Sequence, residues 1–459
     1  MTAEQSAALT FSDSGITETS AGSGYTIDGT TLTITTAGTY RISGSCSEGT
    51  VIVGKGLSNV TLILDNLTLA SSTTAPIVVK KSATANIHLV GTSTLTDNED
   101  PANETSSDAA TAEAFEGAAI KVKSGSTVTF CGDGDLNVVA NAKNGIKGGA
   151  TASLIFNQSG TINVSGNAKV YGATTAGAAV NNGIACDGSL IFNQGTYVIK
   201  AANDGVNAAG GSSSGTDPGA GGGNTFNPGG RPGGPGGGGF NPGGGSSATT
   251  GNYNIYIYGG DLYVNCDGDG LESNGGLYLY GGTQAVLSMR SGGDNSAIDA
   301  DGTVSIQGAS VFTAGTTGMD GSAQSGWFGS NQKYYASKTS YSAGKIINTK
   351  AGSSGSVVFS YALPKAVNYI MASYPSTVSA NTPSFATQAL PLARAVRGAT
   401  LGIAAPFPTA SLPTPASNAA QPKNRRFLRR FLLQPATIRW IRKPLRTKAT
   451  RSPLQATAA

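Results

Sequence analysis

The sequence is poor in residues on which several classes of protein depend. Charged residues make up only 12% of its 459 residues, and His88 is the one histidine. The four cysteines, Cys46, Cys131, Cys186 and Cys266, form no CxxC pair. This composition does not predict a zinc site or a dense disulfide framework, and we expect buried small residues or free thiols instead.

Long apolar runs are missing as well. No stretch is long and apolar enough to span a bilayer, so no membrane span is predicted. The first residues, MTAEQSAALTF, contain neither the basic region nor the apolar region of a secretion signal. If the protein is exported, we expect that its signal was removed or lies outside this sequence.

Acidic residues are absent from the last part of the chain. All 26 lie at or before Asp320, whereas 17 basic residues lie before Gln388 and 13 lie after it. The segment 388–459, with ten arginines and scattered prolines, is either a basic arm for an anionic surface or a translation out of frame. We favour the second interpretation, expect 376–459 to be irregular or disordered, and predict no nucleic-acid partner.

Glycine and a repeated strand pattern are abundant. There are 66 glycines, about twice the usual share. A unit of alternating apolar residues, a polar or glycine turn and a second alternating stretch recurs, and its shortest spacings are 22–27 residues. The units begin at Val60, Ile87, Val128, Leu154, Leu190, Ile255, Leu277 and Val304.

A second short element, seen in NGIKG, DGVNA and DGLES, recurs between these units. Each turn therefore holds three short strands, which bury their apolar residues only when turns stack. The pattern predicts an all-β protein, a right-handed parallel β-helix over 25–375 that follows an N-terminal segment 1–24. Loops are expected at 97–116, 167–181 and 210–251, the last a disordered, low-complexity Gly/Pro-rich insertion.

Stacking the short elements places polar residues in two columns. Residues in register on adjacent turns lie about 4.8 Å apart. Two carboxylates at that distance repel by roughly 3.5 kcal/mol at an effective dielectric constant of about 20. Asp267 and Asp294 each stand two residues before a member of the first column. The first column is Asn144, Asn182, Asp204, Asp269 and Ser296, and the second is Lys147, Ala185, Asn207, Glu272, Asp299 and Asp320.

Such a density of carboxylates favours a bound hard cation. Calcium fits best, because it takes about six to eight oxygen ligands with loose geometry. The alternative is a hydrated ladder of Asn and Asp turns without metal. The site is not an EF-hand, because Tyr278 stands where the closing glutamate of DGDGLE would belong.

Four tyrosines follow the opposite phase to the apolar residues in NIYIYGG and GLYLYGG. Their outward rings suit the C–H faces of sugars, although they also serve to shield a sheet. The predicted polysaccharide-contacting residues are Tyr256, Tyr258, Tyr278 and Tyr280.

The sequence resembles the calcium-binding, carbohydrate-binding β-helix proteins of clostridial type, on VTLILDNLTL, AAIKVKSGSTVTF, the NGI, DGV and DGL series, the Gly/Pro-rich insertion and GKIINTKAGSSGSVVFSYALPKAVNYIMASYP. The resemblance spans Tyr25 to Pro375. It implies a pectate-lyase-like fold, an extracellular or cell-surface location, and attachment to cellulosic and acidic pectin-like polysaccharides. The calcium ligands that it implies are Asp204, Asp267, Asp269, Glu272, Asp294, Asp299 and Asp301.

Three functions follow from these observations. The first is a non-catalytic, calcium-stabilised β-helix that binds plant cell-wall polysaccharide. The second is a calcium-dependent polysaccharide lyase, for which Arg290 is the candidate base, since Lys147 lies three turns from Glu272. The third is a surface adhesin or scaffold that calcium merely rigidifies.

Overall fold

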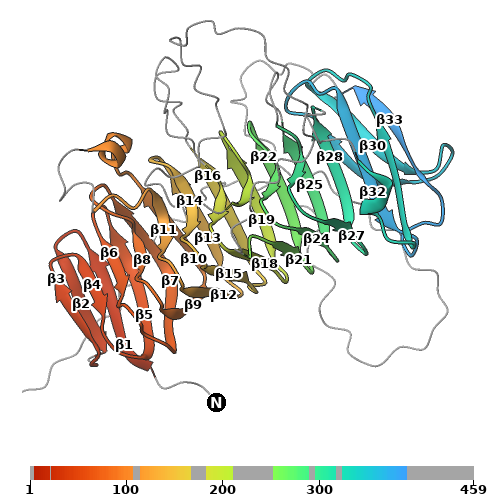
Figure 1. The fold of residues 1–459 in the computed structure, drawn as a ribbon. Coiled ribbons are helices and arrows are strands. Elements are labelled where there is room, and N and C mark those ends of the chain that lie inside the picture. The colour runs from red at the N-terminus through yellow and green to blue at the C-terminus, as the bar shows by residue number, and fades with distance from the viewer. Residues whose placement is uncertain are drawn as a thin grey trace, which may run out of the picture. The chain divides into compact units, whose positions relative to one another are not determined.

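The computed structural model describes residues 5–20, 22–106, 114–166, 182–209, 252–288, 295–316 and 323–389. The chain divides into two compact units, Met1–Leu412 and Pro413–Ala459, and all the described residues belong to the first. Within this unit, parallel strands stack coil upon coil on three faces, which is the predicted parallel β-helix (Figure 1).

Strands at equivalent positions of successive coils pair in parallel and share a face, and the alternation along each strand turns its apolar side chains inward. The first face contains β5 (Gly38–Cys46), β7 (Val60–Ser71), β9 (Thr84–Val90), β12 (Thr127–Gly132), β15 (Ser153–Phe156), β18 (Ser189–Phe192), β21 (Ile255–Ile257), β24 (Leu277–Leu279) and β27 (Val304–Ile306). The second continues from β7 through β10 (Thr92–Asp97), β13 (Asp135–Ala140), β16 (Thr161–Gly166), β19 (Thr196–Ala201), β22 (Asp261–Cys266), β25 (Thr283–Ser288) and β28 (Ser310–Gly315).

The third face is a sheet of ten strands, and it carries the polar columns. Nine of its strands run parallel, and its first two pair antiparallel. They are β3 (Tyr25–Asp28), β4 (Thr31–Ile34), β6 (Thr50–Val53), β8 (Ile77–Val79), β11 (Ala118–Val122), β14 (Asn144–Gly148), β17 (Ile184–Cys186), β20 (Val206–Ala208), β23 (Leu271–Ser273) and β26 (Ile298–Ala300).

The predicted register is confirmed in the core. Val128, Leu154 and Leu190 are partners on consecutive coils of the first face, and all three are fully buried. Two residues further along, Phe130, Phe156 and Phe192 stack with centroids 4.8 and 4.7 Å apart. Because each ring covers the next, the core is a continuous apolar column.

The stack departs from the expected bounds at both ends: it begins earlier and its parallel coils end sooner. β1 (Gln5–Ser12) lies parallel to β5 and antiparallel to β2 (Gly15–Ser20), so residues before 25 already belong to the sheet. The parallel coils end at β28, where further coils were expected up to residue 375. β32 (Tyr369–Pro375) runs antiparallel to β28 and to β29 (Gln332–Ser337). β32 therefore covers the edge that β28 would otherwise expose.

A three-stranded antiparallel sheet completes the C-terminal part: β31 (Val357–Ala362), β30 (Lys345–Ala351) and β33 (Pro383–Ala389). Its Ile347, Phe359 and Tyr361 share one apolar cluster with Tyr263 and Phe312, which point outward from the second face. The apolar outer side of these coils is therefore covered by the C-terminal sheet. The 3₁₀ turns are η1 (Pro101–Thr105) and η2 (Ser325–Trp327).

Several expectations fall outside the described residues: the loop 167–181, the insertion 210–251 and residues 390–459 of the tail. The expectation that the tail is irregular from residue 376 is wrong at its start, because β33 (Pro383–Ala389) pairs with β30. All four cysteines are free thiols, as predicted. The excursion that follows β10 contains η1, and its ends are anchored by the buried carboxylates Asp97, Glu99 and Glu116. No helix in the described ranges is long and apolar enough to cross a membrane.

Candidate metal centre and aromatic face

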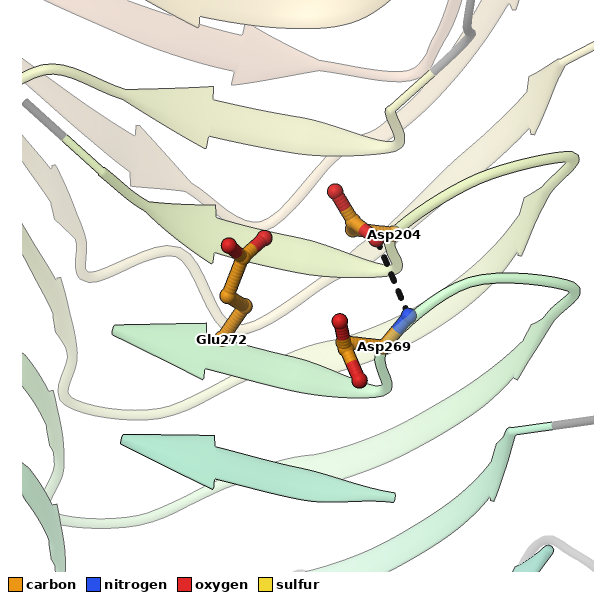
Figure 2. Close-up of side chains that lie close together, drawn as sticks. All are labelled: Asp204, Asp269 and Glu272. Carbon is orange, nitrogen blue, oxygen red and sulfur yellow. Dashed lines mark hydrogen bonds between the residues drawn. The ribbon is translucent and has the colours of Figure 1, made fainter. Parts of the chain in front are cut away.

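The first polar column is a ladder of hydrogen bonds at the turns that lead into the third face. Asn182 Oδ1 accepts from Asp204 N at 3.3 Å, and Asp204 Oδ1 accepts from Asp269 N at 2.9 Å (Figure 2). Asp269 Oδ1 in turn accepts from Ser296 N at 2.5 Å. From Asn182 to Ser296, one side-chain oxygen per coil thus accepts from a backbone N–H of the next coil, and this part of the predicted column is in register. Asn144, the first predicted member, instead donates to Gly117 O at 3.3 Å.

The second column is also in register. Lys147, Ala185, Asn207, Glu272 and Asp299 are successive partners along β14, β17, β20, β23 and β26. The column changes from basic Lys147 to acidic Glu272 and Asp299 along the stack. The Lys147 ammonium is paired with Asp187 at 2.6 Å.

Three carboxyl groups converge where the two columns meet. Oxygens of Asp204, Asp269 and Glu272 lie within 4.8 Å of one another. Figure 2 shows Glu272 extending from β23 toward the coil of Asp204. Asp204 and Asp269 are buried, and Glu272 is half-buried. This is the one group of three or more potential metal-ligating side chains found among the described residues.

Side-chain amides complete the polar lining. Asn207 donates through Nδ2 to Glu272 Oε2 and, at 3.2 Å, to Asp204 Oδ2. Asn203, which the sequence columns did not include, donates to the same Asp204 oxygen at 2.7 Å and to Asn182 Oδ1 at 2.9 Å. The site is therefore rich in oxygen atoms, with amide groups between the carboxylates.

Electrostatics within the group favour a bound positive charge. Burial, followed by the carboxylates of Asp204, Asp269 and Asp299, raises the pKa of Glu272 to about 9. At neutral pH the Glu272 carboxyl therefore holds a proton in the absence of another cation. A cation that is bound by the three carboxylates must displace that proton.

Glycine allows the coils to approach so closely. A Cβ atom on Gly268 would lie closer than 3.0 Å to Asp204 Oδ1 and to the backbone of Asn203. A Cβ on Gly270 would similarly meet Val286 and the Ala297 carbonyl oxygen. The glycines in DGDG are thus required for packing one coil onto the next, a role that the sequence pattern alone did not reveal.

The remaining predicted ligands are dispersed. Asp299 follows Glu272 in register and acts on its pKa. Asp301 is exposed, and its backbone N–H bonds to Ser273 O. Asp267 points away to an ion pair with Lys365. Asp294, Asp320 and the candidate base Arg290 lie outside the described residues.

Lys365 is a functional candidate that the sequence did not indicate. It lies in the C-terminal part, 98 residues after Asp267, and its Nζ also donates to Cys266 O at 3.2 Å. Only the packing of the C-terminal sheet on the second face brings this ammonium group beside the coil of Asp269. No periodic signal marks such a contact.

The four tyrosines form a two-by-two group on the outside of β21 and β24, as predicted. Tyr256 stacks on Tyr278 with centroids 4.9 Å apart and planes 10° apart. Tyr258 and Tyr280 are tilted by 33° and are more exposed, at 51% and 38%. Stacked rings cover each other's faces, so the tilted outer pair offers the larger open aromatic surface.

A family match agrees with the sequence resemblance over part of the chain. Residues 28–213 match the family described as carbohydrate-binding domain-containing proteins, a range that includes Asp204 and Asn207. A solved structure of the polysaccharide lyase-like protein from C. thermocellum, a gadolinium derivative, is similar at 21% identity and a TM-score of 0.40. That match covers 70% of this chain and 98% of the other. No curated protein matches the chain.

Proposed function

We propose that the protein is a non-catalytic, calcium-stabilised β-helix that binds plant cell-wall polysaccharide outside the cell. The observation that carries the proposal is the convergence of Asp204, Asp269 and Glu272 within 4.8 Å. Carboxylate and amide oxygens are the donors that calcium prefers, and the loose arrangement of these side chains suits its variable geometry. Asp204, Asp269 and Glu272 would hold the ion, with Asn207 beside them. Bound calcium would neutralise the carboxylates and offer further positions to oxygen ligands.

A ladder without metal accounts for only part of the site. It uses Oδ1 of Asp204 and of Asp269, which accept backbone N–H groups. Glu272 is not a member of that ladder, yet its carboxyl lies against the two aspartates. Placing a third carboxyl there raises its pKa, which is an energetic cost that a resident cation removes.

The tyrosine group supports carbohydrate binding. Tyr258 and Tyr280 present exposed rings next to one another on adjacent coils, and their ring centroids are 5.7 Å apart. Aromatic rings pack on the C–H faces of neutral sugars, which favours a cellulose-like ligand for this surface. Acidic pectin-like chains are the second ligand of the proposal, held partly through calcium.

Binding to insoluble cellulose and to polygalacturonate, with calcium or with EDTA, tests these roles. We expect Tyr258→Ala with Tyr280→Ala to weaken cellulose binding about tenfold without changing the melting temperature. Glu272→Gln should abolish the rise in melting temperature that calcium causes, whereas the exposed-turn control Asp133→Asn should not. Equal cellulose binding by the tyrosine variant and the unchanged protein would exclude the aromatic face.

A polysaccharide lyase is the second candidate, because Lys365 lies beside the acidic coils. In that reaction a base removes the proton at C5 of a uronate, and the O4-linked sugar leaves as the C4–C5 double bond forms. We expect no unsaturated uronate from polygalacturonate. Calcium-dependent growth of its ultraviolet absorbance, lost in Lys365→Met, would instead establish a lyase. A protein that binds calcium but no glycan would be a scaffold or adhesin.

A further inference from the structure

A cavity of about 730 Å³ lies in the C-terminal part, away from both sites described above. It is formed by β29 with the residues that follow it, the turn from β30 to β31, and the start of β33. Its volume is in the range of pockets that bind small ligands. The lining residues are Tyr335, Ser337, Thr339, Tyr341, 351–355 and 381–385.

The lining has the chemistry of a neutral sugar site. Tyr335, Tyr341 and Phe385 supply aromatic surface, and the exposed fraction of Tyr335 is 44%. Hydroxyl and amide groups, including those of Ser384 and Asn381, surround them. None of the described residues that line the cavity carries a charge. A polyhydroxylated, uncharged ligand satisfies such a surface, and the Lys350 ammonium group at its edge is already hydrogen-bonded to Ser353 O.

The walls of the cavity are held in place by hydrogen bonds. Ser384 Oγ donates to Gly352 O at 2.8 Å, and Tyr374 OH donates to Asn381 O at 2.8 Å. On the turn from β30 to β31, Lys350 Nζ donates to Ser353 O at 3.0 Å. The pairing of β30 with β33 fixes both strands. The cavity is therefore a preformed site, which reduces the entropy lost on binding.

Tyr335 is placed as the aromatic platform. Its ring lies 5.3 Å from that of Phe385 at 45°, so Phe385 supports one side and leaves the rest open to the cavity. Tyr334, the preceding residue of the same strand, instead stacks on Phe328 with ring centroids 3.8 Å apart, so its ring is used in internal packing. The two adjacent tyrosines thus have different roles.

We propose that this cavity binds a neutral oligosaccharide without calcium, as a second glycan site separate from the tyrosine group on β21 and β24. The ligand class follows from the uncharged, aromatic and hydroxyl-rich lining. The proposal needs neither the metal centre nor Tyr258, so each of the two glycan sites can be tested independently of the other.

The test is titration of the full chain with cello-, xylo-, manno- and galacto-hexaose in EDTA, followed by calorimetry and by NMR. We expect at least one hexaose to bind, and Tyr335→Ala to weaken its affinity about tenfold or more. Tyr335→Phe should retain most of the affinity. Val378→Ala, an exposed residue outside the lining, is the matched control.

Asn381→Ala provides a second variant in case Tyr335→Ala lowers the melting temperature. Hexaose binding that survives both substitutions but is lost in Tyr258→Ala with Tyr280→Ala would overturn the proposal and leave the proposed function intact. Absence of binding by all four hexaoses in EDTA would also overturn it. Two independent sites would be supported if Tyr258→Ala with Tyr280→Ala lost cellulose binding but kept hexaose binding.

Discussion

Two groups of buried carboxylates on the same β-helix differ in what neutralises them. Around Glu99, the backbone N–H groups of Glu116 and Gly117 donate to its two oxygens at 2.8 and 2.7 Å. Glu116 is paired with Lys123. Burial raises the pKa of Glu99, and the two backbone N–H groups, followed by Lys121, oppose that rise. This group therefore contains its own positive charges.

Around Glu272, the charged groups with the largest effect on its pKa are all carboxylates. The comparison indicates two uses of the same residue types. The first group ties the excursion after β10 to the coils by internal pairing. The second group concentrates negative charge that an external cation neutralises.

The largest expected effect separates charge from hydrogen bonding in the second group. Asp204→Asn should keep the ladder, because Asn182 already fills the same position one coil earlier. It should still weaken calcium binding by about two orders of magnitude, since a ligand charge is lost. Calorimetric titration measures this. Unchanged affinity would mean that Asp204 is a ladder residue only, and Asp133→Asn is the matched control.

The pH dependence of stability distinguishes the groups next. The folded-state pKa of Glu272 is about 9, above the ordinary value of 4.5, so the folded protein holds a proton that the unfolded chain releases. In EDTA, the free energy of unfolding should fall by up to about 1.4 kcal/mol per pH unit as pH rises from 4.5 to 9. Denaturant titrations at several pH values check this.

Calcium should remove that slope, because the ion replaces the proton, and Glu272→Gln should remove it without calcium. A slope in EDTA that is the same in Glu272→Gln as in the unchanged protein would show that the proton is held elsewhere.

Breaking the internal pairing of the first group should have a smaller effect. Lys123→Met leaves the buried Glu116 carboxylate without its partner, whose ammonium is partly exposed. We expect a loss of about 1–2 kcal/mol in the free energy of unfolding, equal with and without calcium. Lys55→Met, on a turn of an early coil, is the control. A loss of stability that appears only in EDTA would show that the Glu99 group and the Glu272 group are coupled, which would contradict the distinction between them.

The smallest effect on calcium binding is expected at Asp97, a third buried acid near the excursion. Burial, with Glu99 beside it, raises its pKa to about 7, so its contribution to stability falls as pH rises from about 4 to 7. Asp97→Asn should flatten the stability profile in that window. Because no part of the calcium site changes, the calcium-induced shift in melting temperature should stay the same as in the unchanged protein.

Sequence periodicity was sufficient for the register of the coils. Since inward residues repeat with each coil, the partners of Val128 and of Glu272 could be predicted without the structure. The convergence of Asp204, Asp269 and Glu272 followed from the same columns. Asp267, a ligand implied by the family resemblance, is not among the three converging carboxyl groups, because its side chain is paired with Lys365.

Contacts that do not repeat could not be predicted in this way. The antiparallel strand β32, the sheet that covers Tyr263 and Phe312, and the position of Lys365 all depend on one arrangement of the C-terminal part. The cavity around Tyr335 is another contact of this kind, since it joins β29, the turn from β30 to β31 and the start of β33. A column of identical positions carries a signal in every coil, whereas each of these contacts occurs once.

The most direct test of the central claim is a calorimetric calcium titration near pH 7.5 in buffers of different ionisation enthalpy. If Asp204, Asp269 and Glu272 hold the ion, the heat should depend on the buffer and report the release of about one proton for each calcium bound at this site. Glu272→Gln should bind calcium more weakly and release none. Calcium binding without proton release, or no binding at millimolar concentration, would contradict the account and leave the column as a ladder of hydrogen bonds.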